Sequence, residues 1–338
     1  MPRRLITLLA GLSMATLSMA TLSMATAGCG RTAPPPAAGP PPGTPTTAQG
    51  IDEATAAAAF ATLTDLDAAW HARDCAAVVA VTTWVEKTLG GRACAATRNG
   101  RPAPARTPYS EPVFFLPEEG AWFAALAMKP KPGYFVFVQV NDTWRLGFGP
   151  VPAIGDLPGT TAGEPDPAAT AADKPASPAT AADKPASPAT AGGEPDPVTA
   201  RRARLVPQRH LTFLTDPAGL SGVRFPDADP VRRLRDELAA RPARARPDRL
   251  SVDVELLDTP RVIGAGGPML VFHTLRLTFQ QRGAAHPLYG KADLRAFTGK
   301  NTLDRVTGIE IVSLVSELTP DNKVRTVGLR RDLADVRP

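Results

Sequence analysis

The sequence predicts an α+β fold with two domains, each made of short helices followed by an antiparallel, curved sheet. Apolar residues recur at helical spacing between 51 and 89, and a short helix is expected at 229–240. Runs in which apolar residues recur at every second position follow both regions, and turn residues separate these runs. A stretch rich in Pro, Ala and Thr at 153–200 stands between the two patterns. Helices that precede a set of strands indicate an α+β domain, and here the pattern occurs twice.

The first helical region begins near Ile51 and carries an apolar face. Asp74 interrupts the pattern, and we expect it to cap a second helix at 76–89. Gly90 and Gly91 are expected to end that helix. The face of the first helix consists of residues spaced by three and four positions: Phe60, Leu63, Leu66 and Trp70.

Strands are predicted after each helical region. In the second half, Asp229 and Pro230 suit the cap and the first position of the helix at 229–240. A strand or irregular structure is expected at 203–215. The glycine-rich stretch 264–268 joins two strands and predicts a turn. The predicted strands are 112–116, 122–128, 134–140 and 143–148 in the first half, and 250–262, 269–282, 302–318 and 323–332 in the second.

The chain divides into five predicted segments. Residues 153–200 contain near-repeats of ten residues and lack the apolar side chains that a core needs, so we expect a disordered linker. The segments are a signal peptide at 1–28, a lipidated cysteine with a Pro-rich tether at 29–50, an N-terminal domain at 51–152, the linker at 153–200 and a basic C-terminal domain at 201–338.

The N-terminus predicts export and attachment to a membrane. Two arginines and an apolar stretch precede Thr26-Ala27-Gly28-Cys29, which resembles the lipobox of bacterial lipoproteins, where the cysteine carries lipid. Ala25-Thr26-Ala27 also fits an ordinary signal peptidase site, which would release a secreted protein. Residues 5–27 are about long enough for an uncleaved membrane anchor. We expect a protein that is lipid-anchored through Cys29 at the outer face of the cytoplasmic membrane, with secretion as the alternative.

The chain has three cysteines, and an odd number in an exported protein needs an explanation. If Cys29 carries lipid, Cys75 and Cys94 remain, and a disulfide between them can persist outside the cell. Two free thiols, or a metal site that includes His71, are the alternatives.

No hydrolase, nucleotide or metal motif occurs, so no catalytic residue, metal site or cofactor is expected. His273 alternates with apolar residues on one face of a predicted strand, where a histidine can line a pocket and act as an acid or base, or can be a core residue with one backbone hydrogen bond. Asp253 and Glu255 belong to a different predicted strand, 250–262. Val252, Val254 and Leu256 take one face of that strand, so the two carboxylates are expected on its opposite, solvated face. His210 and His286 are expected in irregular stretches without partners.

Charge is uneven along the chain. Residues 201–338 carry 24 basic and 16 acidic side chains, a net of +8, whereas 153–200 carry 2 basic and 7 acidic ones. We expect Arg232, Arg233 and Arg235 to contact anionic lipids or phosphate-rich envelope polymers, and we expect no nucleic acid. A solvated arginine-rich face without a partner is the alternative.

The strand sequences Phe114-Phe115-Leu116-Pro117 and Met269-Leu270-Val271-Phe272 resemble a two-domain lipoprotein family of actinobacteria. That family has a domain of unknown function, so the resemblance implies location and architecture but no activity. Ala68-Ala69-Trp70-His71-Ala72-Arg73-Asp74 resembles the first helix of the NTF2-like superfamily, which implies a curved sheet around a pocket.

Three functions follow from these observations. A non-enzymatic interaction or scaffolding role, with an unidentified protein partner, is favoured. A carrier of a small apolar ligand, with a pocket in one curved sheet, is the alternative. An enzyme that uses His273 is the third.

Overall fold

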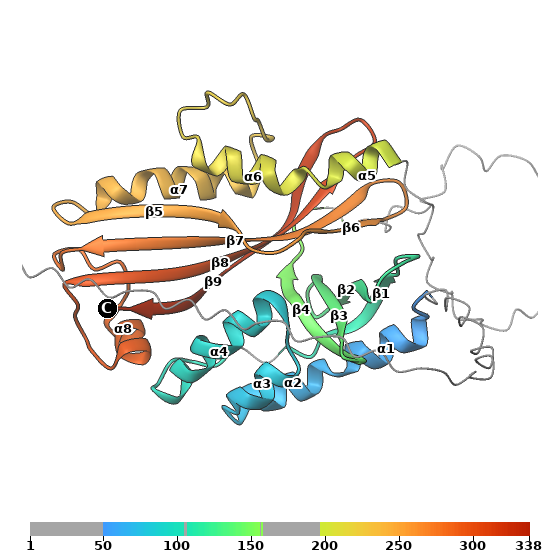
Figure 1. Ribbon diagram of the computed structural model, residues 1–338, viewed down its shortest axis with the longest axis horizontal. Coiled ribbons are helices and arrows are strands. Elements are labelled where there is room, and N and C mark those ends of the chain that lie inside the picture. Colours follow the sequence, from blue (N-terminus) through green and yellow to red (C-terminus); the bar gives the residue numbers. More distant parts are fainter. Residues whose placement is uncertain (1–49, 105–106, 156, 158–196) are drawn as a thin grey trace, which may run out of the picture. The chain divides into compact units, whose positions relative to one another are not determined.

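The computed structural model describes residues 50–104, 107–155, 157 and 197–338, in an α+β arrangement with two antiparallel sheets (Figure 1). The predicted signal peptide, Cys29 and the tether up to residue 49 lie outside the described residues, as does most of the predicted linker. The predicted fold class is confirmed, because each half of the chain brings helices and one antiparallel sheet.

Four helices open the first half: α1 (Glu53–Ala61), α2 (Leu63–His71), α3 (Cys75–Ala80) and α4 (Trp84–Arg98). Asp74 caps α3 as predicted, because its Oδ1 accepts the N–H groups of Ala76 and Ala77, both at 3.1 Å. The prediction that one helix covers 76–89 and ends at Gly90 is wrong. The α4 helix continues through Gly90, where a Cβ atom would stand 2.7 Å from Val78 Cγ1, so the glycine lets α4 pack closely on α3.

The first sheet contains β1 (Ser110–Phe115), β2 (Trp122–Lys129), β3 (Gly133–Val140) and β4 (Thr143–Pro152) in that order, which confirms the four predicted strands. Alternation along β3 divides its side chains between two hydrophobic clusters. Phe135 and Phe137 pack with Phe60 of α1, whereas Tyr134 and Val136 face the second half of the chain.

The second half builds a larger sheet with a helical layer on one face (Figure 1). Strand order is β5-β7-β8-β9, and β6 also pairs with β7. The helices are α5 (Pro197–Ala203), α6 (Val206–Thr215), α7 (Pro230–Arg244) and α8 (Lys291–Thr298), and the strands are β5 (Arg249–Leu256), β6 (Arg261–Gly264), β7 (Met269–Arg282), β8 (Arg305–Leu318) and β9 (Val324–Arg337).

The second half differs from the prediction in four places. Most of the stretch 203–215 is helical, because Val206, His210 and Phe213 of α6 fall on one buried face at helical spacing and Pro207 stands in the first turn, where proline is tolerated. The α5 helix begins at Pro197, inside the predicted linker. The α8 helix was not predicted, and 250–262 forms two strands instead of one.

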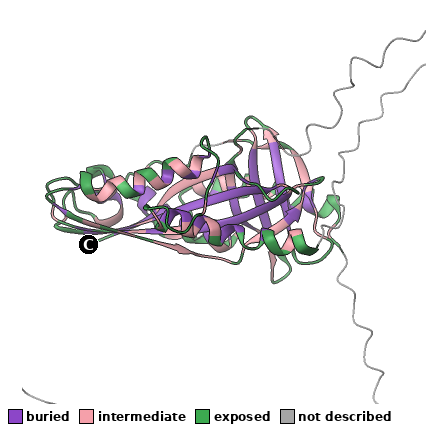
Figure 2. Cartoon of the chain, turned by 90° about the horizontal axis from the view of Figure 1, so that it is seen from above, coloured by how far each residue is buried: buried purple, intermediate pink, exposed green. Residues whose placement is uncertain are grey.

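The two sheets share a hydrophobic cluster, and by their contacts the described residues belong to one compact unit. Phe272 of β7 meets the rings of Tyr134 and Phe148 with centroids 6.2 and 5.7 Å apart. Figure 2 shows that the buried residues are concentrated in the strands, while the helices each expose one side. The two halves are therefore docked on one another through their sheets.

Candidate ligand-binding cavity

A cavity of about 330 Å³ lies between α2, α4, the ends of β3 and β4, and β9. Its wall is mostly apolar, and three aromatic rings contribute to it. Trp70 comes from α2, Phe135 from β3 and Tyr109 from the segment before β1. The aliphatic part of the wall consists of Leu63 and Leu66 of α2, Leu89 and Ala93 of α4, Leu146 of β4 and Leu333 of β9.

A buried ion pair stands in this wall. Arg330 of β9 donates from Nη2 to Oε1 of Glu86 on α4, and the two side chains are 15% and 11% exposed. The same Glu86 oxygen accepts the Gly149 N–H at 3.0 Å, and Arg330 Nη1 donates to the Pro150 carbonyl at 3.1 Å. The end of β4 therefore fixes both partners in place.

Asp332 is the second carboxylate on Arg330. Its Oδ2 lies 2.7 Å from Arg330 Nε, and its side chain is 40% exposed. Arg330 and Asp332 are two positions apart on β9, so they share a face of the strand. One guanidinium is thus shared by two carboxylates at the cavity wall.

Burial controls the ionisation of the cavity wall. It raises the pKa of Glu86, although Arg330 and the Gly149 N–H oppose the shift by favouring the carboxylate. Burial also raises the pKa of Tyr109, which keeps this phenol protonated. The wall therefore offers one buried carboxylate whose charge depends on its neighbours.

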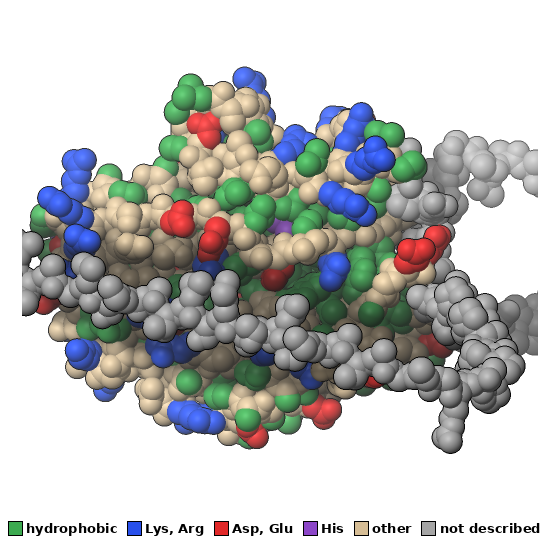
Figure 3. Space-filling model, in the orientation of Figure 1, with side chains coloured by type: hydrophobic (Ala, Val, Ile, Leu, Met, Phe, Trp, Pro, Cys, Tyr) green, Lys and Arg blue, Asp and Glu red, His purple; other side chains and the backbone are tan. Residues whose placement is uncertain are grey.

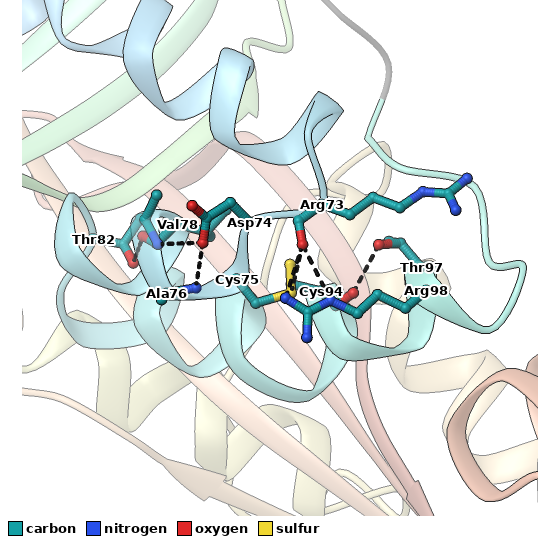
Figure 4. Close-up of a disulfide and its surroundings, with 10 residues drawn as sticks. Arg73, Asp74, Cys75, Ala76, Val78, Thr82, Cys94, Thr97 and Arg98 are labelled. Atoms are coloured by element: carbon teal, nitrogen blue, oxygen red, sulfur yellow. Dashed lines mark hydrogen bonds between the residues drawn. A yellow bond between two sulfur atoms is a disulfide. The ribbon is translucent and has the colours of Figure 1, made fainter.

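The disulfide between Cys75 and Cys94 links α3 to α4 beside the cavity and confirms the predicted pair (Figure 4). Arg98 strengthens this junction, since it donates from Nε and Nη2 to the Arg73 carbonyl at 3.2 and 3.0 Å. Ala93 precedes Cys94 directly and lines the cavity. The crosslink therefore fixes the segment of α4 that forms one wall.

His273, the predicted pocket residue, does not line this cavity. It lies on β7 in the core beneath α6, is 3% exposed, and neither ring nitrogen has a hydrogen-bond partner among the described residues. Its ring lies 4.8 Å from that of His210. The expectation that His210 lacks partners is wrong, because its Nδ1 is 3.1 Å from the Val206 carbonyl and its Nε2 is 3.2 Å from Thr326 Oγ1.

The three arginines predicted to contact anionic surfaces differ in their surroundings. Arg232 donates to the Phe225 carbonyl and pairs with Asp227, both near 3 Å. Arg235 lies over the Phe213 ring, 4.3 Å from its centroid. Arg233 is exposed.

The basic residues of α5 and α7 are spread along the helical layer. Helix α5 and the C-terminal end of α7 lie at opposite ends of that layer (Figure 1). Figure 3 shows Lys and Arg side chains in separate groups with apolar side chains between them. Arg241 at the end of α7 is engaged with Glu237 and Glu310, at 2.9 and 3.3 Å.

The remaining predicted residues lie away from the cavity. Glu255 pairs with Arg276 at 2.7 Å, and Asp253 is exposed on the same strand. Within the residues that the structure describes, no three His, Cys, Asp or Glu side chains converge as a metal site would require. The predicted lipidation residue, Cys29, lies outside those residues.

Sequence reasoning missed the charged residues of the cavity. Glu86 stood within a predicted helix, where a carboxylate is normally solvated. The sequence of β9 did contain a sign of these residues. Arg330 and Asp332 occupy one face of β9, and β9 follows the long apolar strand β8. Charges on the strand face that neighbours a core indicate a buried polar contact.

Comparison with family models, curated proteins and solved structures finds no match for this chain. The resemblances to an actinobacterial lipoprotein family and to the NTF2-like superfamily therefore stay predictions. No helix in the described part of the chain is both long enough and apolar enough to cross a membrane.

Proposed function

We propose that this protein is a carrier of a small, largely apolar ligand that binds between α2, α4 and β9. The observation that carries the proposal is the cavity of about 330 Å³ with an apolar wall and a buried ion pair. Ligand pockets typically have about 300–1,000 Å³, apolar walls and a few fixed polar groups. A scaffolding role, which the sequence favoured, requires no such cavity.

The polar groups in the wall suit recognition more than catalysis. Glu86 accepts a hydrogen bond from Arg330, Asp332 forms an ion pair with the same guanidinium, and Arg330 also donates to the Pro150 carbonyl. Groups fixed in this way orient a ligand at low entropic cost.

We further propose that the carrier works at the outer face of the cytoplasmic membrane, attached through lipid on Cys29. The lipobox resemblance supports the attachment. The disulfide between Cys75 and Cys94 supports a location outside the cytoplasm, where such bonds persist.

The test is titration of the purified protein with a neutral, environment-sensitive fluorophore such as N-phenylnaphthylamine. We expect saturable binding that Ala93→Leu weakens at least about tenfold, a change of about 1.4 kcal/mol, because the added side chain fills the cavity. Ala95→Leu is the matched control, since Ala95 is exposed on the same helix.

The same two variants also show which outcome would overturn the proposal. If Ala93→Leu and Ala95→Leu bind the fluorophore like the unmodified protein, the cavity is not the binding site. Circular dichroism of both variants establishes that the fold is retained.

A further inference from the structure

The helical layer of the second half leaves large apolar side chains in solvent. Val198 of α5 is 51% exposed, Leu205 directly before α6 is 61% exposed, and Leu220 in the loop between α6 and α7 is 89% exposed. These are three of the four large hydrophobic residues that are exposed in the described part of the chain. Figure 3 shows apolar and basic side chains next to one another over this layer. Single exposed leucines are ordinary, so the role of this surface depends on how they are held and on the charges around them.

Leu220 stands at the tip of a folded loop. The Gly219 N–H donates to the Asp216 carbonyl at 3.1 Å, and the Gly222 N–H donates to the Gly219 carbonyl at 3.3 Å. The Asp216 side chain accepts the Ser221 N–H and closes the same turn. Gly219 and Gly222 both have a φ of 71°, a left-handed conformation that glycine adopts without steric cost. The loop therefore holds Leu220 outward by its own hydrogen bonds.

The base of this loop is anchored in the core. Phe225 is 4% exposed, and its ring lies 5.0 Å from that of Phe213 on α6. The Phe225 carbonyl accepts from Arg232 of α7 at 3.1 Å. The loop rises from this base on the side of the helical layer that faces away from the sheet (Figure 1). Leu220 is thus presented at a fixed place on the outer side of the layer.

Arginines are the main charged residues around these apolar side chains. The structure describes every residue from 197 to 224, and this stretch has five basic residues and one acidic residue, Asp216. Among the residues that the structure describes, none of the five basic side chains pairs with a carboxylate. The basic residues are Arg201, Arg202, Arg204, Arg209 and Arg224.

The acidic residues that follow in the sequence do not cancel this charge, because they have partners of their own. Asp227 pairs with Arg232 at 3.0 Å, and Asp236 lies 3.5 Å from Arg235. Two more acidic residues precede α5, and with them the stretch 194–224 still has five arginines and three acidic residues. Unpaired positive charge therefore lies at α5 and in the loop, while Arg232 and Arg235, which were predicted to meet anionic surfaces, are engaged.

This arrangement fits a lipid surface better than a protein partner. A stable protein interface has a continuous apolar centre with a polar rim. Here Leu205 and Leu220 come from separate segments, and Leu205 directly follows Arg204. A lipid interface accepts single aliphatic side chains among its acyl chains, while the stems of arginines lie along the apolar boundary and their guanidinium groups reach the phosphates.

We propose that the outer side of the helical layer docks on a membrane of anionic phospholipids. Leu205 and Leu220 enter the boundary between the headgroups and the acyl chains. Arg201, Arg204 and Arg224 pair with lipid phosphates. The proposal depends neither on the cavity nor on the carrier function, and it uses side chains of the folded part in place of a covalent lipid.

The test uses a chain that begins at residue 30, so that no lipid contributes to binding. This chain contains the whole compact unit of residues 47–338. Its sedimentation is measured with vesicles of phosphatidylcholine, and with vesicles of phosphatidylcholine and phosphatidylglycerol in equal parts. We expect binding to the anionic vesicles to be at least about tenfold tighter than to the neutral ones, and to weaken as salt is added, because salt screens exposed charges.

Two pairs of variants locate the surface. Leu220→Ser should weaken binding to the anionic vesicles about tenfold, because a leucine leaves the apolar boundary, whereas Leu220→Met should bind normally. Arg201→Ser with Arg204→Ser should also weaken it at least about tenfold and reduce the dependence on salt. Arg295→Ser with Lys300→Ser removes the same charge from exposed positions on and after α8, and should leave binding unchanged.

The contrary outcomes are distinct. The proposal is overturned if the chain binds neither kind of vesicle, or if the α8 pair of changes weakens binding as much as the α5 pair. It is also overturned if Leu220→Ser binds like the unmodified chain, because the surface then attracts anions without entering a membrane. Fluorophore titration of the same samples reports on the cavity, so the carrier function stands or falls separately.

Discussion

Glu86 of α4 and Arg330 of β9 form a buried ion pair although they lie 244 positions apart in the chain. Both side chains also bond to the end of β4, at Gly149 and Pro150. The pair therefore joins the helices and sheet of the first half to the last strand of the second. It follows that the cavity exists only while the two halves are docked.

Arg330→Met should destabilise the protein by about 3–5 kcal/mol, because it leaves the buried Glu86 carboxylate without its partner. Combining it with Glu86→Gln should cost less than the sum of the two single changes, since neither buried charge then remains. Denaturant unfolding followed by tryptophan fluorescence measures all three free energies.

An exposed ion pair supplies the control. Lys129 and Glu111 pair with side chains that are 64% and 56% exposed, so Lys129→Met should cost at most about 1 kcal/mol. Equal losses for Arg330→Met and Lys129→Met would show that burial of the Glu86 pair contributes nothing to stability.

His210 and His273 should make the protein less stable as the pH falls from about 6.5 toward about 4. Burial lowers the pKa of His210 to about 4 and that of His273 well below its usual value of 6.5. The unfolded chain therefore binds more protons than the folded one in this window, so the free energy of unfolding decreases with acidity, by about 3 kcal/mol for His210.

Denaturant unfolding near pH 7 and pH 5 measures this effect. His210→Gln should reduce the difference between the two conditions, and His71→Gln, at an exposed position, should leave it unchanged. A His210→Gln protein with the same pH dependence as the unmodified chain would mean that this histidine does not titrate on unfolding.

The strands could be predicted because alternation along a strand is visible locally. In β3, Tyr134 to Phe137 send successive side chains to two different clusters, and the sequence alone shows that period. The continuation of α4 beyond residue 89 could not be predicted, because Gly90 serves close contact with Val78 and does not end the helix.

The disulfide should contribute about 3 kcal/mol, because it closes a loop of 19 residues in the unfolded chain. Replacing both Cys75 and Cys94 by Ala should lower stability by this amount and also weaken fluorophore binding, since α4 loses its link to α3 next to Ala93. Thermal unfolding and the titration measure the two effects. Unchanged affinity in the double variant would show that the crosslink does not shape the cavity.

The cavity could not be predicted because its charged residues come from segments that only tertiary packing brings together. Glu86 and Arg330 share no local pattern, and no motif marks them. His273 was singled out instead, because a histidine among apolar strand residues is visible in the sequence. The structure assigns that residue to the core beneath α6.

Cys29→Ser should release the protein from the membrane fraction or stall its processing, if lipid on Cys29 is the anchor. Metabolic labelling with a fatty acid and fractionation of cells test this. Cys75→Ala with Cys94→Ala serves as the control, because these cysteines form the disulfide and carry no lipid. Membrane association that survives Cys29→Ser would refute lipid anchoring.

The two halves should stay together after the chain is cut between residues 158 and 196. Beyond the Glu86–Arg330 pair, the Ile154 N–H donates to the Val327 carbonyl at 2.8 Å, and Phe272 packs against Tyr134. These contacts join the halves without using the predicted linker. A protease site that replaces the near-repeat at 178–187 allows cleavage of the folded protein.

After cleavage, size-exclusion chromatography should show both fragments in one peak with fluorophore binding retained, and denaturant should separate them. Arg330→Met in the cut protein should weaken the association, because it removes a contact that crosses between the fragments. Lys129→Met should not, since its partner Glu111 lies in the same fragment. If the fragments elute apart and each keeps its secondary structure, the halves are independent domains, and a cavity built from both cannot be the binding site.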